Sequence, residues 1–340
     1  MKKFTSELFK RKIVVISDYV DPEIYSAIEL KDEIKFLADV EDQIKMHGLA
    51  YEYVEVKNQD ELLATLAKHP VEQTVIFNWC EYLDGQEDTD RIVTKLLDDR
   101  GFVYTGADTA CLELLTSKEE TKKQLLAHGL LTPNYLVAAS AENLDDRGLQ
   151  YPLIAKLENR HASKGLSLAN IVHNHEQLVV EVEKLLKKYD SRILVEELVD
   201  GQEHTVTVWG NGRTAKCIYF TKEVYLDPTV STIYTEEGKF DFGSSEEKNL
   251  KSRCLDKLKY KKTIALLHDL VLNAYRLLKV DDYGRFDLRE KDGKYYFLDC
   301  NPNPWIGIGS QLLKGSKKLG YNSGETVMKI CDFALQRHMT

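Results

Sequence analysis

Charged and amide side chains recur at every second position of two short runs near the C-terminal end of the chain. Alternation along an extended strand places Arg285, Asp287 and Arg289 on one face of the first run. The same alternation places Asp299 and Asn301 on one face of the second run. Two carboxylates, an amide and a preceding arginine form a hard-oxygen site that suits Mg²⁺ carrying phosphates. The alternative is a solvated strand face with ordinary salt bridges.

The turn between the two runs decides whether the two polar faces coincide. An Asp-Gly dipeptide between them favours a hairpin. A two-residue turn would pair Asp287 with Leu298 and point the two carboxylates to opposite sides. A three-residue loop over Lys291–Gly293 would instead pair Asp287 with Phe297 and place Asp299 on the face of Asp287. We expect the three-residue loop, with Phe297 and Asp299 on a shared face and a pair of divalent ions between the carboxylates.

Composition excludes several classes of protein. The 340 residues include 55 acidic and 46 basic side chains, a formal net charge of −9, so no broad cationic surface for nucleic acid is expected. Apolar runs such as Ile13–Ile16 are far shorter than the roughly 20 residues of a membrane span. Six widely separated cysteines indicate neither a zinc knuckle nor a disulfide scaffold. We therefore expect a cytoplasmic globular protein whose partners are small molecules, with no nucleic acid and no membrane.

The pattern of elements changes twice along the chain. Strands predicted at Lys12–Ser17, Tyr51–Val56, Thr74–Trp79 and Phe102–Thr105 alternate with helices, which indicates an open α/β domain with a mostly parallel sheet. From Ser117 a smaller α+β module follows, and we predict one of its strands at Leu168–Val172. The remainder is rich in strands. We predict three domains: 1–115, an N-terminal α/β domain; 116–200, a central subdomain; and 201–340, a C-terminal subdomain.

Two connections in the C-terminal part stand out. Asn211-Gly212 lies between two predicted strands and favours a hairpin turn, because both residues tolerate a positive φ. The polar segment Thr235–Lys259 precedes a predicted helix and contains no clear pattern of its own. A connection of that length in a compact protein is usually a lid or a disordered linker.

Several segments occur along the chain in a specific order and spacing. They are Phe102-Val-Tyr-Thr-Gly-Ala with Thr116–Lys122, Tyr151-Pro-Leu-Ile-Ala-Lys with Ala162-Ser-Lys-Gly, Leu194-Val-Glu-Glu-Leu-Val-Asp-Gly-Gln-Glu, Gly284-Arg-Phe-Asp, and Phe297-Leu-Asp-Cys-Asn-Pro-Asn-Pro. Together they resemble the ATP-grasp superfamily, and within it the D-alanine–D-alanine ligase group. The resemblance implies a three-module ATP-grasp fold of α/β and α+β type, with an N-terminal open α/β domain, a small central lid domain and a C-terminal mixed-sheet domain.

The resemblance also implies which residues bind ATP. Lys118 and Lys156 match lysines that hold the phosphates, and Ser163 matches a loop serine that caps them. Lys239 matches a lid lysine for the γ-phosphate, and Glu203 matches the carboxylate that accepts hydrogen bonds from the ribose hydroxyls. The linker that lines the adenine pocket is matched by four successive residues, Glu196, Glu197, Leu198 and Val199.

The residues nearest the chemistry are implied in the same way. Asp287, Asp299 and Asn301 match the Mg²⁺ ligands, for two ions, with Mn²⁺ as an alternative. Arg285 matches an arginine that stabilises the oxyanion developing on the reacting carboxyl group. Ser310 matches a serine that binds the carboxylate of the acceptor, and a helix N-cap is the alternative role for it.

Two departures from the family pattern concern the substrates. Trp305 stands where the family has a glycine whose amide contributes to the oxyanion hole, although the backbone N–H of Trp305 can still serve. The family's glycine-rich N-terminal loop, with its glutamate for the substrate ammonium, is missing. Asp18, Asp21 and Glu23 occupy that region without matching the motif. The resemblance therefore does not extend to D-alanine as the donor.

The function implied by the resemblance is ATP-dependent ligation of a carboxylate to an amine through an acyl-phosphate, with release of ADP and phosphate. The substrates would be small carboxylates and amines, and a homodimer is compatible with the resemblance. The alternatives are a non-catalytic nucleotide-binding protein and an ATP-grasp kinase that phosphorylates without ligating.

Overall fold

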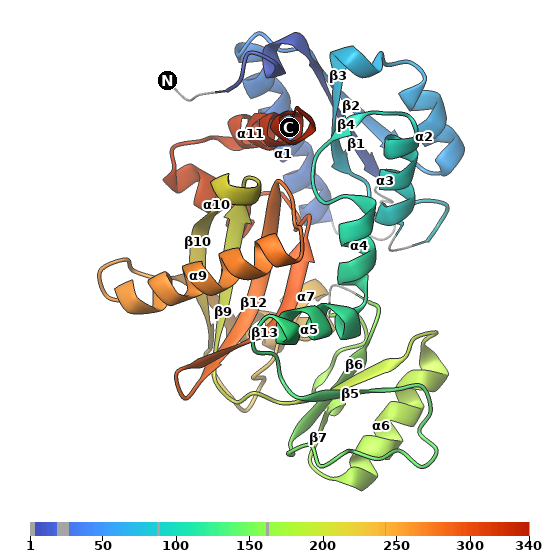
Figure 1. The fold of residues 1–340 in the computed structure, drawn as a ribbon, viewed down its shortest axis with the longest axis vertical. Helices are drawn as coiled ribbons and strands as arrows, with labels where there is room; N and C mark the ends of the chain where they lie inside the picture. Colours follow the sequence, from blue (N-terminus) through green and yellow to red (C-terminus); the bar gives the residue numbers. More distant parts are fainter. Residues whose placement is uncertain (1–3, 19–26, 87–88, 161–162, 242, 340) are drawn as a thin grey trace.

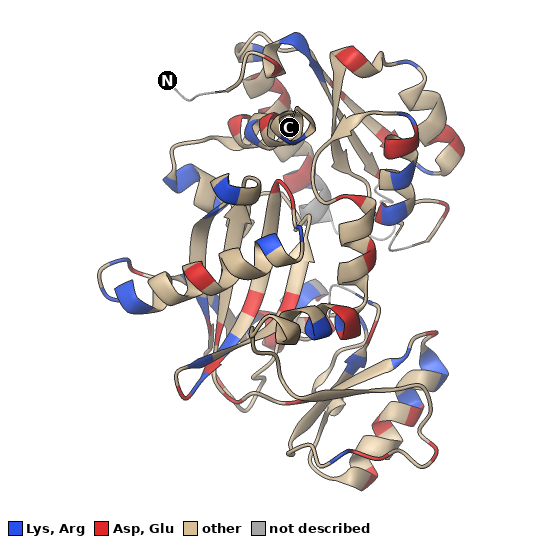
Figure 2. Ribbon diagram, viewed as in Figure 1, with Lys and Arg blue, Asp and Glu red and all other residues tan. Residues whose placement is uncertain are grey.

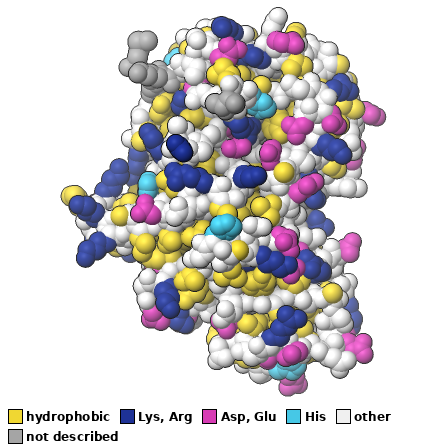
Figure 3. Space-filling model, in the orientation of Figure 1, with side chains coloured by type: hydrophobic (Ala, Val, Ile, Leu, Met, Phe, Trp, Pro, Cys, Tyr) yellow, Lys and Arg dark blue, Asp and Glu magenta, His cyan; other side chains and the backbone are white. Residues whose placement is uncertain are grey.

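The computed structural model describes residues 4–18, 27–86, 89–160, 163–241 and 243–339. Their strands form three separate β-sheets with helices around them (Figure 1). None of the described helices is both long and apolar enough to cross a membrane. Acidic and basic residues are interspersed along all three parts of the ribbon (Figure 2), and the face drawn in Figure 3 shows the same mixture.

The N-terminal domain is an open sheet of four parallel strands in the order β2-β1-β3-β4. Its elements are η1 (Leu8–Lys10), β1 (Lys12–Asp18), α1 (Ala27–Met46), β2 (Tyr51–Val56), α2 (Gln59–Leu66), η2 (Val71–Gln73), β3 (Thr74–Trp79), α3 (Asp90–Asp99) and β4 (Val103–Tyr104). Alternate residues of β1 enter different cores, since Ile13 packs with α1 whereas Val14 packs with α2 and α3. The predicted open α/β domain is confirmed.

The central domain has a sheet of four antiparallel strands in the order β5-β8-β6-β7. Its elements are β5 (Tyr135–Ala138), β6 (Leu153–Leu157), η3 (Leu168–Asn170), β7 (Ile171–Val172), α6 (His175–Lys188) and β8 (Ile193–Glu197). Helix α6 covers one face of the sheet and shares with it a core that is separate from those of the other domains.

The C-terminal domain is built on a five-stranded antiparallel sheet in the order β11-β10-β9-β12-β13. The strands are β9 (Gln202–Trp209), β10 (Lys216–Tyr225), β11 (Leu250–Cys254), β12 (Tyr283–Lys291) and β13 (Lys294–Pro302). The helices that follow or flank them are η4 (Gly212–Thr214), α7 (Glu236–Phe240), α8 (Ser245–Asn249), α9 (Lys261–Leu277), α10 (Gln311–Lys318) and α11 (Ser323–His338). Helix α9 lies across one face of this sheet (Figure 1).

Helices from the edges of the predicted domains pack across their boundaries. Residues of α4 (Thr109–Thr116) and α5 (Lys118–Ala127) enter the core between α9 and the C-terminal sheet. The last helix, α11, returns to pack against α1 of the N-terminal domain (Figure 1). The three sheets fall within the ranges 1–115, 116–200 and 201–340, while the boundaries themselves stay a prediction.

The hairpin of β12 and β13 differs from the expected one in its turn and register. Asp292 and Gly293 both have positive φ, 52° and 75°, so the turn has two residues rather than three. The ladder then runs regularly to Leu288, which pairs with Phe297 rather than leaving Phe297 opposite Asp287. The three-residue loop was therefore wrong.

A β-bulge restores the arrangement of carboxylates that the wrong loop had been expected to produce. The register shifts between Asp287 and Leu288, so that Leu298 is an extra residue and Asp287 lies opposite Asp299. The bulge also separates Phe297 from Asp299, contrary to the expectation of a shared face. Phe297 is buried against Phe286, with ring centroids 6.3 Å apart, whereas Asp299 faces the pocket.

Three local predictions also need correction. The hairpin predicted at Asn211-Gly212 is confirmed by the antiparallel pairing of β9 with β10, and Gly212 has a positive φ of 48°, but Asn211 has a φ of −117° and its side chain bonds Asp282. The first half of the strand expected at Leu168–Val172 is the 3-10 helix η3, whose end Asn170 accepts a hydrogen bond from the Ser167 amide at 2.9 Å. The segment Thr235–Lys259 is not an unstructured linker, since it forms α7, α8 and β11.

A buried polar joint connects the N-terminal domain to the C-terminal sheet. Asp282 accepts hydrogen bonds from the Gly106 amide at 2.8 Å and from the Asn211 side chain at 2.9 Å. Arg337 on α11 donates to the Gly106 carbonyl at 2.8 Å. The Asn303 side chain accepts from the Ala107 amide at 2.8 Å, next to the place where a Cβ on Gly106 would lie. These bonds hold the loop after β4 against the segment that follows β13.

Gly106→Ala is expected to destabilise the protein more than an alanine at an open glycine of similar conformation. A Cβ at Gly106, with φ +91°, would lie 2.2 Å from Asn303 Oδ1, whereas Gly129, with φ +75°, has open space around it. We expect Gly129→Ala to cost about 1 kcal/mol through backbone strain. Gly106→Ala should cost at least about 2 kcal/mol more, since the Ala107 amide loses its buried acceptor. Urea unfolding of both variants measures the difference, and equal midpoints would contradict the role of the joint.

Candidate active site

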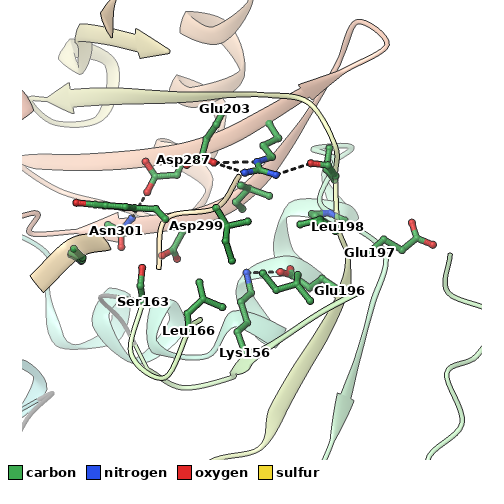
Figure 4. Close-up of a pocket in the computed structure, with 18 of the residues that line it drawn as sticks. Lys156, Ser163, Leu166, Glu196, Glu197, Leu198, Glu203, Asp287, Asp299 and Asn301 are labelled. Carbon is green, nitrogen blue, oxygen red and sulfur yellow. Dashed lines mark hydrogen bonds and ion pairs between the residues drawn. The ribbon is translucent and has the colours of Figure 1, made fainter. Parts of the chain in front are cut away.

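A pocket lies between the central and C-terminal domains and gathers most of the residues singled out from the sequence (Figure 4). One wall comes from β6 and β8 with the segment that follows, a second from β12 and β13, and a third from α7. The predicted residues that line it are Lys156, Ser163, Glu196, Glu197, Leu198, Val199, Glu203, Lys239, Arg285, Asp287, Asp299 and Asn301. Lys118 and Ser310 are not part of this lining.

The acidic face of the hairpin is held by a short hydrogen-bond network. Asp287 Oδ2 accepts from Arg285 Nη2 at 3.0 Å and from Asn301 Nδ2 at 3.2 Å. Arg285 lies opposite Asn301 in the ladder, and Asp287 lies opposite Asp299. Burial disfavours the charged guanidinium of Arg285, but Asp287 more than offsets this, so the pKa of Arg285 is raised above its ordinary value.

The donor set of this face fits a hard divalent cation. Asp287 and Asp299 present carboxylate oxygens, and rotation of the Asn301 amide would present its oxygen in place of the Nδ2 that now bonds Asp287. Among the described residues, no group of three or more His, Cys, Asp and Glu side chains is arranged to hold a metal ion. Two acids and one amide are oxygen donors of the kind that Mg²⁺ prefers.

The opposite end of the pocket contains a buried carboxylate between two lysines. Glu196 is only 1% exposed, and its two oxygens pair with Lys122 and Lys156. Burial raises the pKa of Glu196, but the two ammonium groups outweigh it and lower the pKa below its ordinary value. Sequence reasoning assigned Lys122 no role, because Lys122 lies on helix α5 and its partner Glu196 lies 74 positions away on strand β8, so the pair forms only in the fold.

Lys118 is buried behind the pocket rather than on its lining. It begins α5 after Ser117, whose hydroxyl caps the helix by accepting from the Glu120 amide. The Lys118 ammonium donates to the Arg160 carbonyl at the start of the loop that contains Ser163. Burial lowers the pKa of Lys118, and the charge of Asp299 partly opposes that effect. Lys118 is thus within electrostatic reach of the acidic face.

The loop with Ser163 and the helix with Lys239 contact each other. Ser163 has a positive φ of 60°, and it leads into Gly165, whose amide donates to the Glu236 carboxylate at 2.8 Å. Glu236 in turn donates its amide to the Leu166 carbonyl at 2.9 Å. Because Glu236 opens α7, these bonds bring Lys239 on α7 to the same side of the pocket as Ser163.

Arg289 is a pocket residue to which no role was assigned from the sequence. It bonds Glu203, so that the carboxylate predicted to meet a ribose has a protein partner already. The alternation of β12 placed Arg289 on the face of Arg285 and Asp287, and that signal was correct. Its partner could not be identified, because Glu203 lies on the neighbouring strand β9.

The remaining predicted residues occupy other positions. Ser310 caps α10, with its hydroxyl accepting from the Leu313 amide at 3.2 Å, which is the N-cap role considered as the alternative. The Trp305 ring lies over Gly307, where a Cβ would be 2.0 Å from it, and Trp305 is 58% exposed. Asp21 and Glu23 lie outside the described residues.

Asp18 and Glu81 meet at the carboxyl edge of the N-terminal sheet. Asp18 ends β1, and its carboxylate accepts from the Glu81 amide at 3.3 Å. The side chain of Glu81 is exposed, and its charge acts on Lys239 and Tyr283 of the C-terminal domain. Glu81 therefore lies at the carboxyl end of the N-terminal sheet, near enough for its charge to act on Lys239, a position that no sequence motif had indicated.

A family model and individual relatives point to the same family of proteins. Residues 128–332 match the family model described as D-ala D-ala ligase C-terminus. A D-alanine–D-alanine ligase of a Marinomonas species is 30% identical over 74% of this chain and 75% of that protein. The D-alanine–D-alanine ligase of Xanthomonas axonopodis pv. citri is 27% identical over 72% of this chain and 74% of that protein.

The solved structures agree on the fold. The crystal structure of D-alanine–D-alanine ligase from Bacillus anthracis complexed with ATP superposes with a TM-score of 0.72. The superposition covers 97% of this chain and 99% of that one at 20% sequence identity. At this identity the match supports the three-module fold.

Lys239 is expected to couple ATP binding to proton uptake. Burial, followed by the charge of Arg285, lowers the pKa of Lys239 to about 8. Phosphate oxygens beside it would favour the ammonium form, so binding above about pH 8 should take up a proton and weaken as the pH rises further. Calorimetry in two buffers of different ionisation enthalpy measures this uptake. Lys239→Arg should abolish it and exposed Lys314→Arg should not; unchanged uptake in Lys239→Arg would refute the assignment.

Proposed function

This chain belongs to the D-alanine–D-alanine ligase family, and from that premise we propose that it is an ATP-dependent ligase that joins a small carboxylate to an amine. The observation that carries the proposal is the meeting of three separate segments at one pocket. The acidic face of β12 and β13, Lys239 on α7 and the Ser163 loop converge at one end. A carboxylate face opposed by cations is the arrangement that phosphoryl transfer needs.

ATP would lie along the pocket from the β8 linker to the acidic hairpin. We propose that residues 196–199 read the adenine, with Glu196 held in place by its two lysines. Glu203 would accept from the ribose, and the phosphates would extend toward Ser163 and Lys239. Lys156, paired with Glu196, is nearer the base linker than the acidic hairpin (Figure 4), so a contact with the phosphates requires it to reach along the pocket.

Asp287, Asp299 and Asn301 would hold Mg²⁺, and we propose two ions, with Mn²⁺ as an alternative. When bound, the cations would neutralise phosphate charge and orient the γ-phosphoryl group. Asp299 is opposite Asp287 because of the bulge, so both carboxylates present oxygens on the same face. Lys239 adds a positive charge from the other wall of the pocket.

The proposed reaction has two steps. An oxygen of the substrate carboxylate attacks the γ-phosphorus of ATP, which breaks the bond to ADP and forms an acyl-phosphate. The amine nitrogen then attacks the acyl carbon, loses a proton and displaces phosphate, leaving an amide. Arg285, fixed by Asp287, would stabilise the tetrahedral oxyanion between attack and displacement. The Trp305 backbone N–H is the second candidate donor.

The charge of Glu81 suggests where an amino-acid substrate would lie. Glu81 follows β3 at the carboxyl end of a parallel sheet, where ligands of open α/β domains usually bind. Its charge acts on Lys239, which lines the pocket together with the acidic hairpin. We propose that Glu81 binds the ammonium group of an amino-acid substrate, replacing the glutamate of the missing N-terminal motif.

We propose that the enzyme is cytoplasmic. All six cysteines are free, which is compatible with the reducing cytoplasm expected for this protein. A homodimer remains a prediction.

Asp287→Ala and Asp299→Ala are each expected to abolish turnover without unfolding the protein. Loss even of outer partners of metal ligands commonly costs 10–100-fold, so loss of a ligand should cost about 100-fold or more. Phosphate release from Mg-ATP across pairs of amino acids and amines measures this, with Asp269→Ala, a surface acid on α9, as the control. Full activity in either pocket variant would refute the metal assignment, and release with a single substrate would indicate a kinase instead.

Glu81→Gln is expected to raise KM for the amino-acid substrate about tenfold with little change in kcat, because a charge-assisted bond made equally before and during the reaction is lost. Exposed Glu72→Gln serves as the matched control. Steady-state kinetics with that substrate varied and ATP saturating measures both constants. An unchanged KM would remove Glu81 from the substrate site.

A further inference from the structure

Arg289 is a buried arginine at the centre of the nucleotide end of the pocket. Resting on the proposed role of Glu203 toward ribose, we propose that Arg289 is a positioning residue that sets the selectivity of the site for a ribonucleotide. It would do so by fixing Glu203 with one carboxylate oxygen directed at the ligand. Nothing in the family resemblance assigns a role to this residue.

Arg289 holds the Glu203 carboxylate through one of its two oxygens. Arg289 Nη2 and Nε donate to Glu203 Oε2 at 2.9 and 3.1 Å, and the Tyr225 hydroxyl lies 3.4 Å from the same oxygen. Across the part of the chain that the structure describes, no hydrogen-bond donor is recorded on Oε1. The carboxylate is thus anchored through one oxygen, and the other oxygen can accept a hydroxyl group from a ligand in the pocket.

The same guanidinium also fixes the adenine linker. Arg289 Nη1 donates to the Val199 carbonyl at 3.0 Å, and Arg289 is only 5% exposed. The linker also approaches the end of β12 closely, since a Cβ on Gly201 would lie 2.0 Å from the Glu290 carbonyl oxygen. The distance between the base-reading backbone and the ribose-reading carboxylate is therefore set by one planar side chain.

A third bond extends the arrangement toward the phosphate end. Arg289 Nη2 also donates to the Thr232 carbonyl, in the segment that leads into α7 and Lys239. A lysine could not reproduce this set of contacts, because a single ammonium lacks the rigid fork that reaches three acceptors in fixed directions. Replacement of Arg289 would leave Glu203 a partly buried carboxylate whose remaining hydrogen-bond partner is the Tyr225 hydroxyl.

A nucleotide that lacks a ribose hydroxyl cannot donate a hydrogen bond to the Glu203 carboxylate. The wild-type protein is therefore expected to bind ATP about tenfold more tightly than at least one of 2′-deoxy-ATP and 3′-deoxy-ATP, as for a hydrogen bond to a charged group. If Arg289 acts through Glu203, its removal should weaken the binding of ATP more than the binding of the deoxy analogue, so that the preference for ATP falls. If Arg289 only supported the fold, the binding of both nucleotides would weaken by the same factor.

The test measures dissociation constants for ATP and both deoxy analogues by calorimetry. Arg289→Met should reduce the preference for ATP from about tenfold to about twofold, and Arg289→Lys should give an intermediate preference. Arg276→Met is the control, because Arg276 is an exposed arginine on α9 that donates to the Gly212 carbonyl and does not line the pocket; this variant should keep the full preference. If Arg289→Met does not fold, Arg289→Lys decides the question alone.

Failure of this inference can be told apart from failure of the proposed function. Glu203→Ala should also lose the preference for ATP. If the wild type shows no preference, or Glu203→Ala retains it, the ribose role of Glu203 is wrong and the role of Arg289 falls with it. If the wild type and Glu203→Ala behave as expected but both Arg289 variants keep the full preference, only the inference about Arg289 is overturned.

Discussion

Strand β12 is hydrogen-bonded on both sides, to β9 and to β13, and its two faces have opposite characters. Phe286 and Leu288 enter the core beneath α9, while Arg285, Asp287 and Arg289 face the pocket. Burying one large apolar side chain stabilises the fold by about 1.5–3 kcal/mol, so a slip of one residue would be very unfavourable. The apolar face therefore determines the position of every charged group on the other face.

The same packing explains why the bulge is tolerated. Without an extra residue, the tight Asp-Gly turn would leave Leu298 opposite Asp287 and carry Asp299 to the other face. With the bulge, Phe297 packs into the core and Asp299 lies opposite Asp287. The apolar residues of β13 then face the core and the polar residues face the pocket. This burial offsets the local loss of ladder hydrogen bonds at the bulge.

The pocket contains more charge than a protein interior usually accepts, and several of these charges pair with a group of opposite sign. Glu196 lies between Lys122 and Lys156, and Arg289 holds Glu203. Such pairs add little net stability, because desolvation of the two ions offsets most of their attraction. Their effect is on geometry: the acceptors and cations that would meet ATP are already oriented before it binds, which reduces the entropic cost of binding.

The sequence by itself determined the local periodicity and the order of the motifs. Alternation put Arg285, Asp287 and Arg289 on one face, and the motif order predicted three modules and most of the pocket residues, because both depend on neighbours along the chain. Tertiary structure decided the rest. The register of Asp299 depended on packing of Phe297, and the partners of Lys122 and Arg289 came from other strands. Contacts between residues far apart in sequence arise only when the chain is folded, since burial and charge pairing act through space.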